Sequence, residues 1–241
     1  MKYVGLVLLV LFSVQCQKGN LDASKPKDET STNKVNTQLN LEDISVPDVD
    51  PKLAALGPME SIKELDKTIE TYKSGPNLSR EDEEANKKLK ERVIRGTFDL
   101  FELCRLSLDK HWNEIDESQR KYFANLMTRL LERKAIFSKE QVKGNGKAYN
   151  VSYNKETYLD DEKKSALVAT KINVPSEKVD LTINYKLLST VNGWKIFDVI
   201  VDDASLVENY KFQFDTIITK YGYQELINRM EKKLSEMGSS H

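Results

Sequence analysis

Residues 179–201 read VDLTINYKLLSTVNGWKIFDVIV, and this stretch decides the fold. Apolar and polar side chains alternate along its first half, where the apolar members are Val179, Leu181, Ile183, Tyr185 and Leu187. A period of two residues is the pattern of a β-strand. The turn Val191-Asn192-Gly193 separates this strand from a second one, Trp194 to Val201. Two strands joined by a short polar turn predict an antiparallel hairpin.

Two further extended runs precede the hairpin, at about residues 151–159 and 166–172. Short polar connections separate these runs, so the sequence predicts a four-stranded antiparallel meander. In the fourth strand we expect two apolar faces, because strict alternation would separate the apolar residues into two sets. The sets are Trp194, Ile196 and Ile200 on one face and Phe197, Val199 and Val201 on the other. Such a strand is central or covered on both sides.

Helical spacing of apolar residues flanks the meander on both sides. Before it, the pattern predicts helices over about 52–72, 79–111 and 116–137, with Ser79 as the cap of the second. After it, the pattern predicts one helix over about 205–222 and a shorter helix behind it. Helices, a meander and two C-terminal helices together predict an α+β fold, with a curved sheet that helices cover on one face.

The first residues have the features of a secretion signal. Lys2 is followed by an apolar run, Val4 to Phe12, that is too short to span a bilayer, and Cys16 comes shortly after it. The pattern resembles a bacterial lipobox, which predicts a signal peptide over 1–16 with Cys16 as the lipidated residue. The alternative is an ordinary secretory signal that is cut nearby. Residues 17–50 are polar and predict a disordered tether, so the folded domain is expected over 51–237.

Composition and cysteine content exclude several classes of function. The 37 basic and 38 acidic residues nearly cancel, so no surface for nucleic acid is expected. Cys104 is the only cysteine after Cys16, which leaves no internal disulfide and no thiolate metal cluster. Cys104 lies in a helical, leucine-rich stretch and is expected to be a small buried hydrophobe. We expect no metal site, because the pairs Asp160-Asp161 and Asp202-Asp203 are typical of turns.

Several segments carry a family resemblance. Gly193–Val201, continued by Ala204–Phe214, is similar to the signature of the MlaC family, also called the toluene-tolerance family. A second set of segments is similar, in order and spacing, to the helical half of the family. These segments are Phe98–Leu100, Leu108–Trp112, Glu117–Arg120, Phe123 and Leu130–Glu132. Two positions depart from the family pattern: Lys211 stands where arginine is usual, and Asp203 stands where glycine is usual. A lipid anchor also departs from it, because familiar members are soluble periplasmic proteins.

The resemblance implies a phospholipid carrier on the periplasmic side of the cell envelope, here anchored to a membrane through Cys16. It would move glycerophospholipids between the inner and outer membranes and so maintain outer-membrane lipid asymmetry. Implied partners are phospholipid, an inner-membrane Mla-type ABC transporter with a lipid-binding ring component, and an outer-membrane complex of lipoprotein and porin. No cofactor and no catalysis are implied, since the phospholipid is cargo. The cavity between sheet and helices is expected to be lined by Phe123, Leu130, Tyr185, Leu187, Val199, Val201, Leu206, Tyr210 and Phe214.

Two other functions remain open at this point. An enzyme would use Asp198 as a base, because a buried carboxylate with apolar neighbours can be a catalytic base. Asp198 can equally pair with a backbone donor or with a residue such as Lys211. For His111, a cap or surface role is favoured over catalysis. The other alternative is a surface or periplasmic lipoprotein whose solidly packed domain binds proteins.

Overall fold

The computed structural model describes residues 50–73, 75, 77–134, 150–175 and 178–238. The predicted signal peptide, its Cys16 and the tether up to residue 49 lie outside the described residues. So does the end of the predicted third helix beyond residue 134. These predictions stay predictions.

The strands of the described chain form one sheet in the order β1-β2-β3-β4-β5, and each neighbouring pair is antiparallel. Their bounds are β1 (Asn150–Tyr158), β2 (Ser165–Val174), β3 (Val179–Thr190), β4 (Gly193–Val201) and β5 (Ala204–Ser205). The predicted meander is confirmed. The fifth strand was not predicted, because two residues are too few to show an alternation.

A β-bulge in β4 corrects the prediction for its two faces. Lys186 pairs with Asp198, but the next residue of β3, Leu187, pairs with Ile196, so Phe197 is an extra residue. An extra residue shifts the alternation by one position. Directly paired residues lie on the same face, so Ile196, Val199 and Val201 share one face instead of lying on opposite faces.

The first predicted helix is split into α1 (Pro51–Ala54) and α2 (Pro58–Glu70). The break falls where Gly57 caps α2 in an extended conformation and Pro58 occupies its first helical position. Proline suits that position, because the N–H that it lacks would have no partner there. The apolar pattern runs through this break and therefore did not reveal it.

The second predicted helix is also divided. Ser79 and Asp82 form the expected capping box of α3 (Arg80–Thr97), but α3 ends before Phe98. Phe98 is extended and bridges to Ile196 of β4. Asp99 then caps α4 by accepting a hydrogen bond from Glu102 N at 2.9 Å. The chain continues through α4 (Leu100–Leu108) and the 3₁₀ helix η1 (Asp109–Glu114).

The remaining helices lie where the pattern predicts them. They are α5 (Glu117–Lys134), α7 (Leu206–Tyr221) and α8 (Tyr223–Gly238). The expectation of a shorter last helix is wrong, because α7 and α8 each have 16 residues. Ser205 Oγ accepts a hydrogen bond from Glu208 N at 3.1 Å and so caps α7. Gly222 ends α7 with a φ of 86°, a conformation that glycine adopts without a steric penalty.

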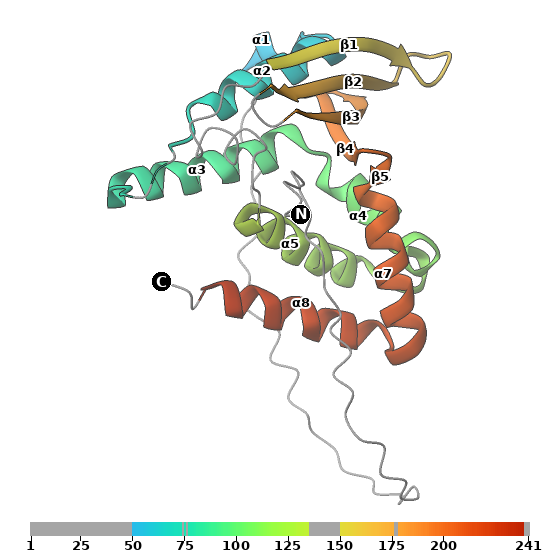
Figure 1. The fold of residues 1–241 in the computed structure, drawn as a ribbon. Helices are drawn as coiled ribbons and strands as arrows, with labels where there is room; N and C mark the ends of the chain where they lie inside the picture. The colour runs from blue at the N-terminus through green and yellow to red at the C-terminus, as the bar shows by residue number, and fades with distance from the viewer. Residues whose placement is uncertain (1–49, 74, 76, 135–149, 176–177, 239–241) are drawn as a thin grey trace, which may run out of the picture.

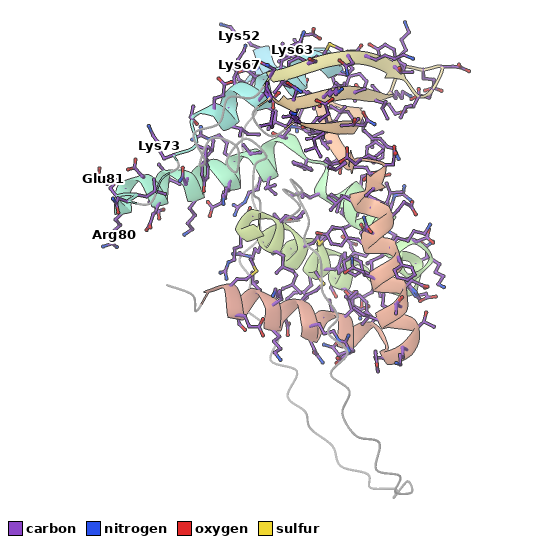
Figure 2. The ribbon with its side chains drawn as sticks, viewed as in Figure 1. Lys52, Lys63, Lys67, Lys73, Arg80 and Glu81 are labelled. Atoms are coloured by element: carbon purple, nitrogen blue, oxygen red, sulfur yellow. The ribbon has the colours of Figure 1, made fainter. Side chains whose placement is uncertain are left out.

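Figure 1 shows the arrangement: α1 and α2 lie beside the sheet, whereas α5 and α8 stack below it and α7 runs down one side. The helix α7 contacts α4, α8 and β4, and α8 packs on α5 and α7. The charged side chains labelled in Figure 2 lie on α1, on α2, on the connection that follows α2 and at the start of α3. The α+β class is confirmed. No helix within the described ranges is long and apolar enough to cross a membrane.

Candidate functional site

The nine predicted cavity residues come from both layers of the fold. Phe123 and Leu130 lie on α5, Tyr185 and Leu187 on β3, Val199 and Val201 on β4, and Leu206, Tyr210 and Phe214 on α7. Eight of them are buried members of a single hydrophobic cluster, and Tyr185, which is half-buried, packs against it. The structure therefore brings all nine into one interior. Whether they contact lipid stays a prediction.

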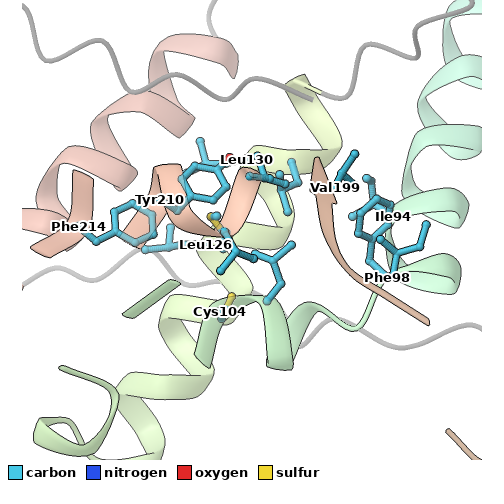
Figure 3. Close-up of a cluster of buried hydrophobic side chains, with 14 of the residues drawn as sticks. Ile94, Phe98, Cys104, Leu126, Leu130, Val199, Tyr210 and Phe214 are labelled. Atoms are coloured by element: carbon cyan, nitrogen blue, oxygen red, sulfur yellow. The ribbon is translucent and has the colours of Figure 1, made fainter. Parts of the chain in front are cut away.

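The helical part of this interior is built on an aromatic stack. The rings of Tyr210 and Phe214, one turn apart on α7, are 5.3 Å apart and nearly parallel. Phe123 of α5 meets Phe214 edge-on, with 5.6 Å between the ring centroids. Both arrangements are favourable for aromatic pairs. Figure 3 shows Leu130 beside Tyr210 in this part of the cluster.

The sheet part of the interior lies on one face of β3 and β4. Tyr185 pairs directly with Val199, and Val201 pairs with Ile183 two residues from Tyr185. Burial raises the pKa of Tyr185, and the nearby Asp66 and Tyr153 raise it further. Tyr153 of β1 donates a hydrogen bond to Asp66 of α2, and α2 contacts β1 and β2, so α2 covers this face of the sheet.

Ile94 near the end of α3 and Phe98 just after it join the two parts, and neither is among the nine predicted cavity residues. In Figure 3, Ile94 and Phe98 lie beside Val199 at the sheet end of the cluster. Ile94 is fully buried and Phe98 is 7% exposed. In the sequence, the helical spacing of these two residues places them on one apolar stripe of the helix predicted over 79–111. Only the bridge between Phe98 and Ile196, which is a tertiary contact, places them next to the predicted cavity residues.

The carboxylate of Asp198 is bound by groups of three other residues of the protein. Ser205 Oγ donates to its carboxylate at 2.8 Å, and the Val207 N–H donates to Oδ1 at 3.1 Å. Lys186 Nζ lies 3.2 Å from Oδ2, and the residue is only 2% exposed. The predicted backbone donor is thus present. The suggested partner Lys211 is wrong, because the bulge turns Asp198 toward Lys186 on the neighbouring strand.

Lys211 and Asp203, the two departures from the family pattern, lie in different parts of the fold. Lys211 Nζ lies 3.3 Å from Asp109 Oδ2 at the surface. Asp202 and Asp203 have φ angles of 44° and 69° in the turn between β4 and β5. Aspartate tolerates this left-handed region better than most residues. Asp202 also accepts a hydrogen bond from Thr182 N at 2.9 Å, which fixes the turn against β3.

His111 connects η1 to α7. Its Nδ1 lies 2.6 Å from Glu114 Oε2, and its Nε2 lies 3.0 Å from Asp215 Oδ1. The expectation was a cap or surface role. The residue is 6% exposed, so the surface role is wrong, and the ring connects η1 with α7. Hydrogen bonds from Lys110 and His111 lower the pKa of Asp215 to about 2.

A pocket of about 280 Å³ lies beside His111. It is lined by Leu108, Asp109, Lys110, His111, Glu208, Lys211, Phe212 and Asp215. None of the nine cavity candidates contributes to this lining. Within the described residues no group of three or more His, Cys, Asp or Glu side chains is placed to hold a metal ion.

Cys104 is a free, fully buried thiol, as expected. Burial, with a smaller effect of the Asp99 charge, raises its pKa above the ordinary value. A thiol that stays protonated is a poor nucleophile. Cys104 therefore acts as an apolar side chain of the interior.

These features define an α+β protein with a shared apolar interior between a curved sheet and a helical layer. A protein-family profile described as MlaC protein matches residues 63–232, so the chain belongs to the MlaC family. No curated protein matches the chain. Among solved structures, the chain is similar to a phospholipid-binding protein from Ralstonia solanacearum that was solved in complex with a phospholipid. The identity is 18% and the TM-score 0.51, and the match covers 79% of this chain and 89% of the other. At this identity the likeness shows the fold.

Proposed function

We propose that the chain is a carrier that holds phospholipid in its apolar interior and moves it between the inner and outer membranes. The observation that carries this proposal is the single hydrophobic cluster that joins the α2-covered sheet face to the α5–α7 stack. Membership of the MlaC family supports the proposal, as does a fold neighbour described as phospholipid-binding. Each lipid methylene kept from water is worth about 0.8 kcal/mol, so an apolar interior removes most of the cost of crossing water.

The surroundings of Asp198 weigh against the enzyme alternative. A general base needs a free lone pair within reach of a substrate. The carboxylate of Asp198 is buried and already bound by Ser205, Val207 and Lys186. Its position at the start of α7 is typical of a structural cap.

Exposed aromatic residues fit the interaction-module alternative as well as the carrier. Phe212 on α7 is 75% exposed, and Phe101 on α4 is 54% exposed. Large exposed aromatic side chains are common in protein interfaces. A carrier that exchanges cargo with membrane complexes also needs such contacts, so these residues are compatible with both functions.

We propose that a lipid on Cys16 anchors the chain on the periplasmic side of a membrane and that residues 17–50 let the domain reach away from it. Several acyl chains on one residue give firm attachment. Replacement Cys16→Ser should move the chain from the membrane fraction to the soluble periplasmic fraction. Retention of the Cys16→Ser chain in the membrane fraction would argue against lipid anchoring.

The proposed partners are an Mla-type ABC transporter with its lipid-binding ring and an outer-membrane lipoprotein and porin complex. Family membership supports this proposal. In-cell cross-linking from Phe212, the most exposed aromatic residue in the described part of α7, should capture a component of one of these complexes. Failure to capture either, with the chain correctly localised, would count against these partners.

A vesicle transfer assay tests the carrier function. The chain from Gln17 onward is mixed with donor vesicles that contain a labelled phospholipid and with unlabelled acceptor vesicles. The transfer rate should rise in proportion to the protein concentration. A rate equal to that without protein, measured with folded protein, would reject the carrier function.

A further inference from the structure

Some buried polar side-chain atoms of the described residues have no hydrogen-bond partner within the protein. Within the described residues, the buried side-chain atoms that have no hydrogen-bond partner are Ser107 Oγ, Asn184 Oδ1, Tyr210 Oη and Gln213 Oε1. Three of these residues lie on α4 and α7, which pack against each other. Buried polar atoms are almost always paired in native proteins, and leaving one unpaired costs stability. Unpaired atoms in this interface therefore need an explanation.

Tyr210 is the clearest case. It is 1% exposed, and its ring is held by the parallel stack on Phe214. A phenylalanine would make the same ring contacts without a buried, unpaired hydroxyl. Packing thus accounts for the ring of Tyr210 but not for its oxygen. A partner from outside the chain would account for it.

The surroundings of Tyr210 define the chemistry of that partner. Burial raises the pKa of Tyr210 well above its ordinary value, so the hydroxyl remains a hydrogen-bond donor. Figure 3 places Tyr210 among Leu126, Leu130 and Phe214, which are uncharged. A phosphate group would bring an ionic charge into this apolar site, which is strongly unfavourable. An ester carbonyl is a neutral acceptor, and in a diacyl lipid it lies directly at the start of the apolar tails.

We propose that the Tyr210 hydroxyl donates a hydrogen bond to an acyl ester carbonyl of the bound lipid. This inference rests on the proposed function, since it requires lipid in the interior around α7. The bond sets the depth at which the lipid sits, with the tails beyond Tyr210 and the charged head group outside the cluster. It also makes the interior select ester-linked over ether-linked lipids, because ethers lack the carbonyl oxygen. Since neighbouring side chains cover Tyr210, the helices around it part when lipid enters.

The test compares two lipids that differ only in this linkage. The chain from Gln17 onward is incubated with vesicles that contain equal amounts of a diacyl phospholipid and its dialkyl ether analogue. The heads and chain lengths are matched, and bound lipid is counted by native mass spectrometry. Wild type should prefer the diacyl lipid by about threefold to tenfold, the range for one net hydrogen bond. Tyr210→Phe should lose this preference.

A stability measurement separates this role from a structural one. After removal of lipid, Tyr210→Phe should unfold at the same temperature as wild type or at a higher one, because the replacement removes an unpaired group. The matched control is Tyr223→Phe. Tyr223 donates to the Gln119 carbonyl oxygen at 3.1 Å, so its replacement should lower the unfolding temperature and leave the lipid preference intact.

The outcomes distinguish the inference from the function on which it rests. Equal uptake of both lipids by wild type, or an unchanged preference in Tyr210→Phe, overturns the inference and leaves the carrier function standing. A lower unfolding temperature of lipid-stripped Tyr210→Phe shows that the hydroxyl serves the fold, which also overturns it. If wild type takes up neither lipid, the carrier function fails and the inference fails with it.

Discussion

Asp198 is the residue whose role depends most on the fold around it. In the sequence it stands between apolar residues, a pattern that leaves a catalytic base open but favours a structural role in which Asp198 pairs with a donor of the protein. In the fold, the bulge at Phe197 turns it toward Lys186 and the start of α7. A carboxylate at a helix N-terminus is stabilised by the helix dipole and by the free N–H groups there.

Replacement of Asp198 by asparagine should therefore destabilise the fold. Asp198→Asn keeps the shape but removes the charge that binds Lys186 and the N–H of Val207. We expect a loss of about 1–3 kcal/mol in the free energy of unfolding, measured by urea titration. Lipid bound per folded chain should not change. An Asp198→Asn protein as stable as the exposed-turn control Asp161→Asn would contradict this role.

Asp215 makes the stability of the junction between η1 and α7 depend on pH. Its pKa is lowered to about 2, chiefly by the hydrogen bond from Lys110 and then by that from His111. A lowered pKa means that the folded state resists protonation, so the contribution is complete above the ordinary value of 3.8 and is lost as pH falls toward about 2. Between about pH 5 and pH 2, the urea midpoint should fall further for wild type than for Asp215→Asn. Parallel falls would refute this linkage.

Among the helices and strands, the sequence predicted those features that depend on residues close to one another in the chain. The strands of the meander follow from alternation, and the caps Ser79 and Ser205 follow from side chains that reach nearby N–H groups. The end of α3 at Thr97 does not follow from local pattern, because Phe98 is extended through its bridge to Ile196, which is distant in sequence. The bulge in β4 is another such feature, since pairing with β3 defines it.

An ion pair fixes α3 to α5 beside the interior. Arg95 Nε lies 2.5 Å from Glu132 Oε1, and Arg95 Nη2 donates to Glu132 Oε2 at 3.2 Å. The side chains are only 20% and 9% exposed, respectively. Removing one partner of a buried pair leaves the other charge without compensation, which costs far more than breaking a surface pair.

Glu132→Ala should lower the free energy of unfolding by about 2 kcal/mol, less than for a fully buried pair because Arg95 retains some exposure. The double replacement Arg95→Met with Glu132→Leu should recover much of this loss. Glu117→Ala, which breaks the exposed pair with Lys121, is the matched control and should change stability little. Equal effects of Glu132→Ala and Glu117→Ala in urea titrations would show that the α3–α5 ion pair contributes no more to stability than an exposed pair.

For the molecule as a whole, the sequence predicted that the nine candidates lie in or against one apolar interior, whereas their contact with a ligand stays a prediction. The nine candidates lie in one cluster because apolar periodicity identifies inward faces. Periodicity cannot distinguish solid core from cavity wall, since both are apolar. It also cannot show that the Tyr210 hydroxyl lacks a partner, because hydrogen bonding depends on the neighbours that the fold provides.

The central claim is that this interior holds phospholipid. Native mass spectrometry with lipid extraction tests it most directly, on the chain from Gln17 onward after gentle purification from a Gram-negative host. We expect a bound mass that matches diacyl phospholipid, at about one lipid per chain. A clean protein mass that remains free of lipid after incubation with liposomes would contradict it.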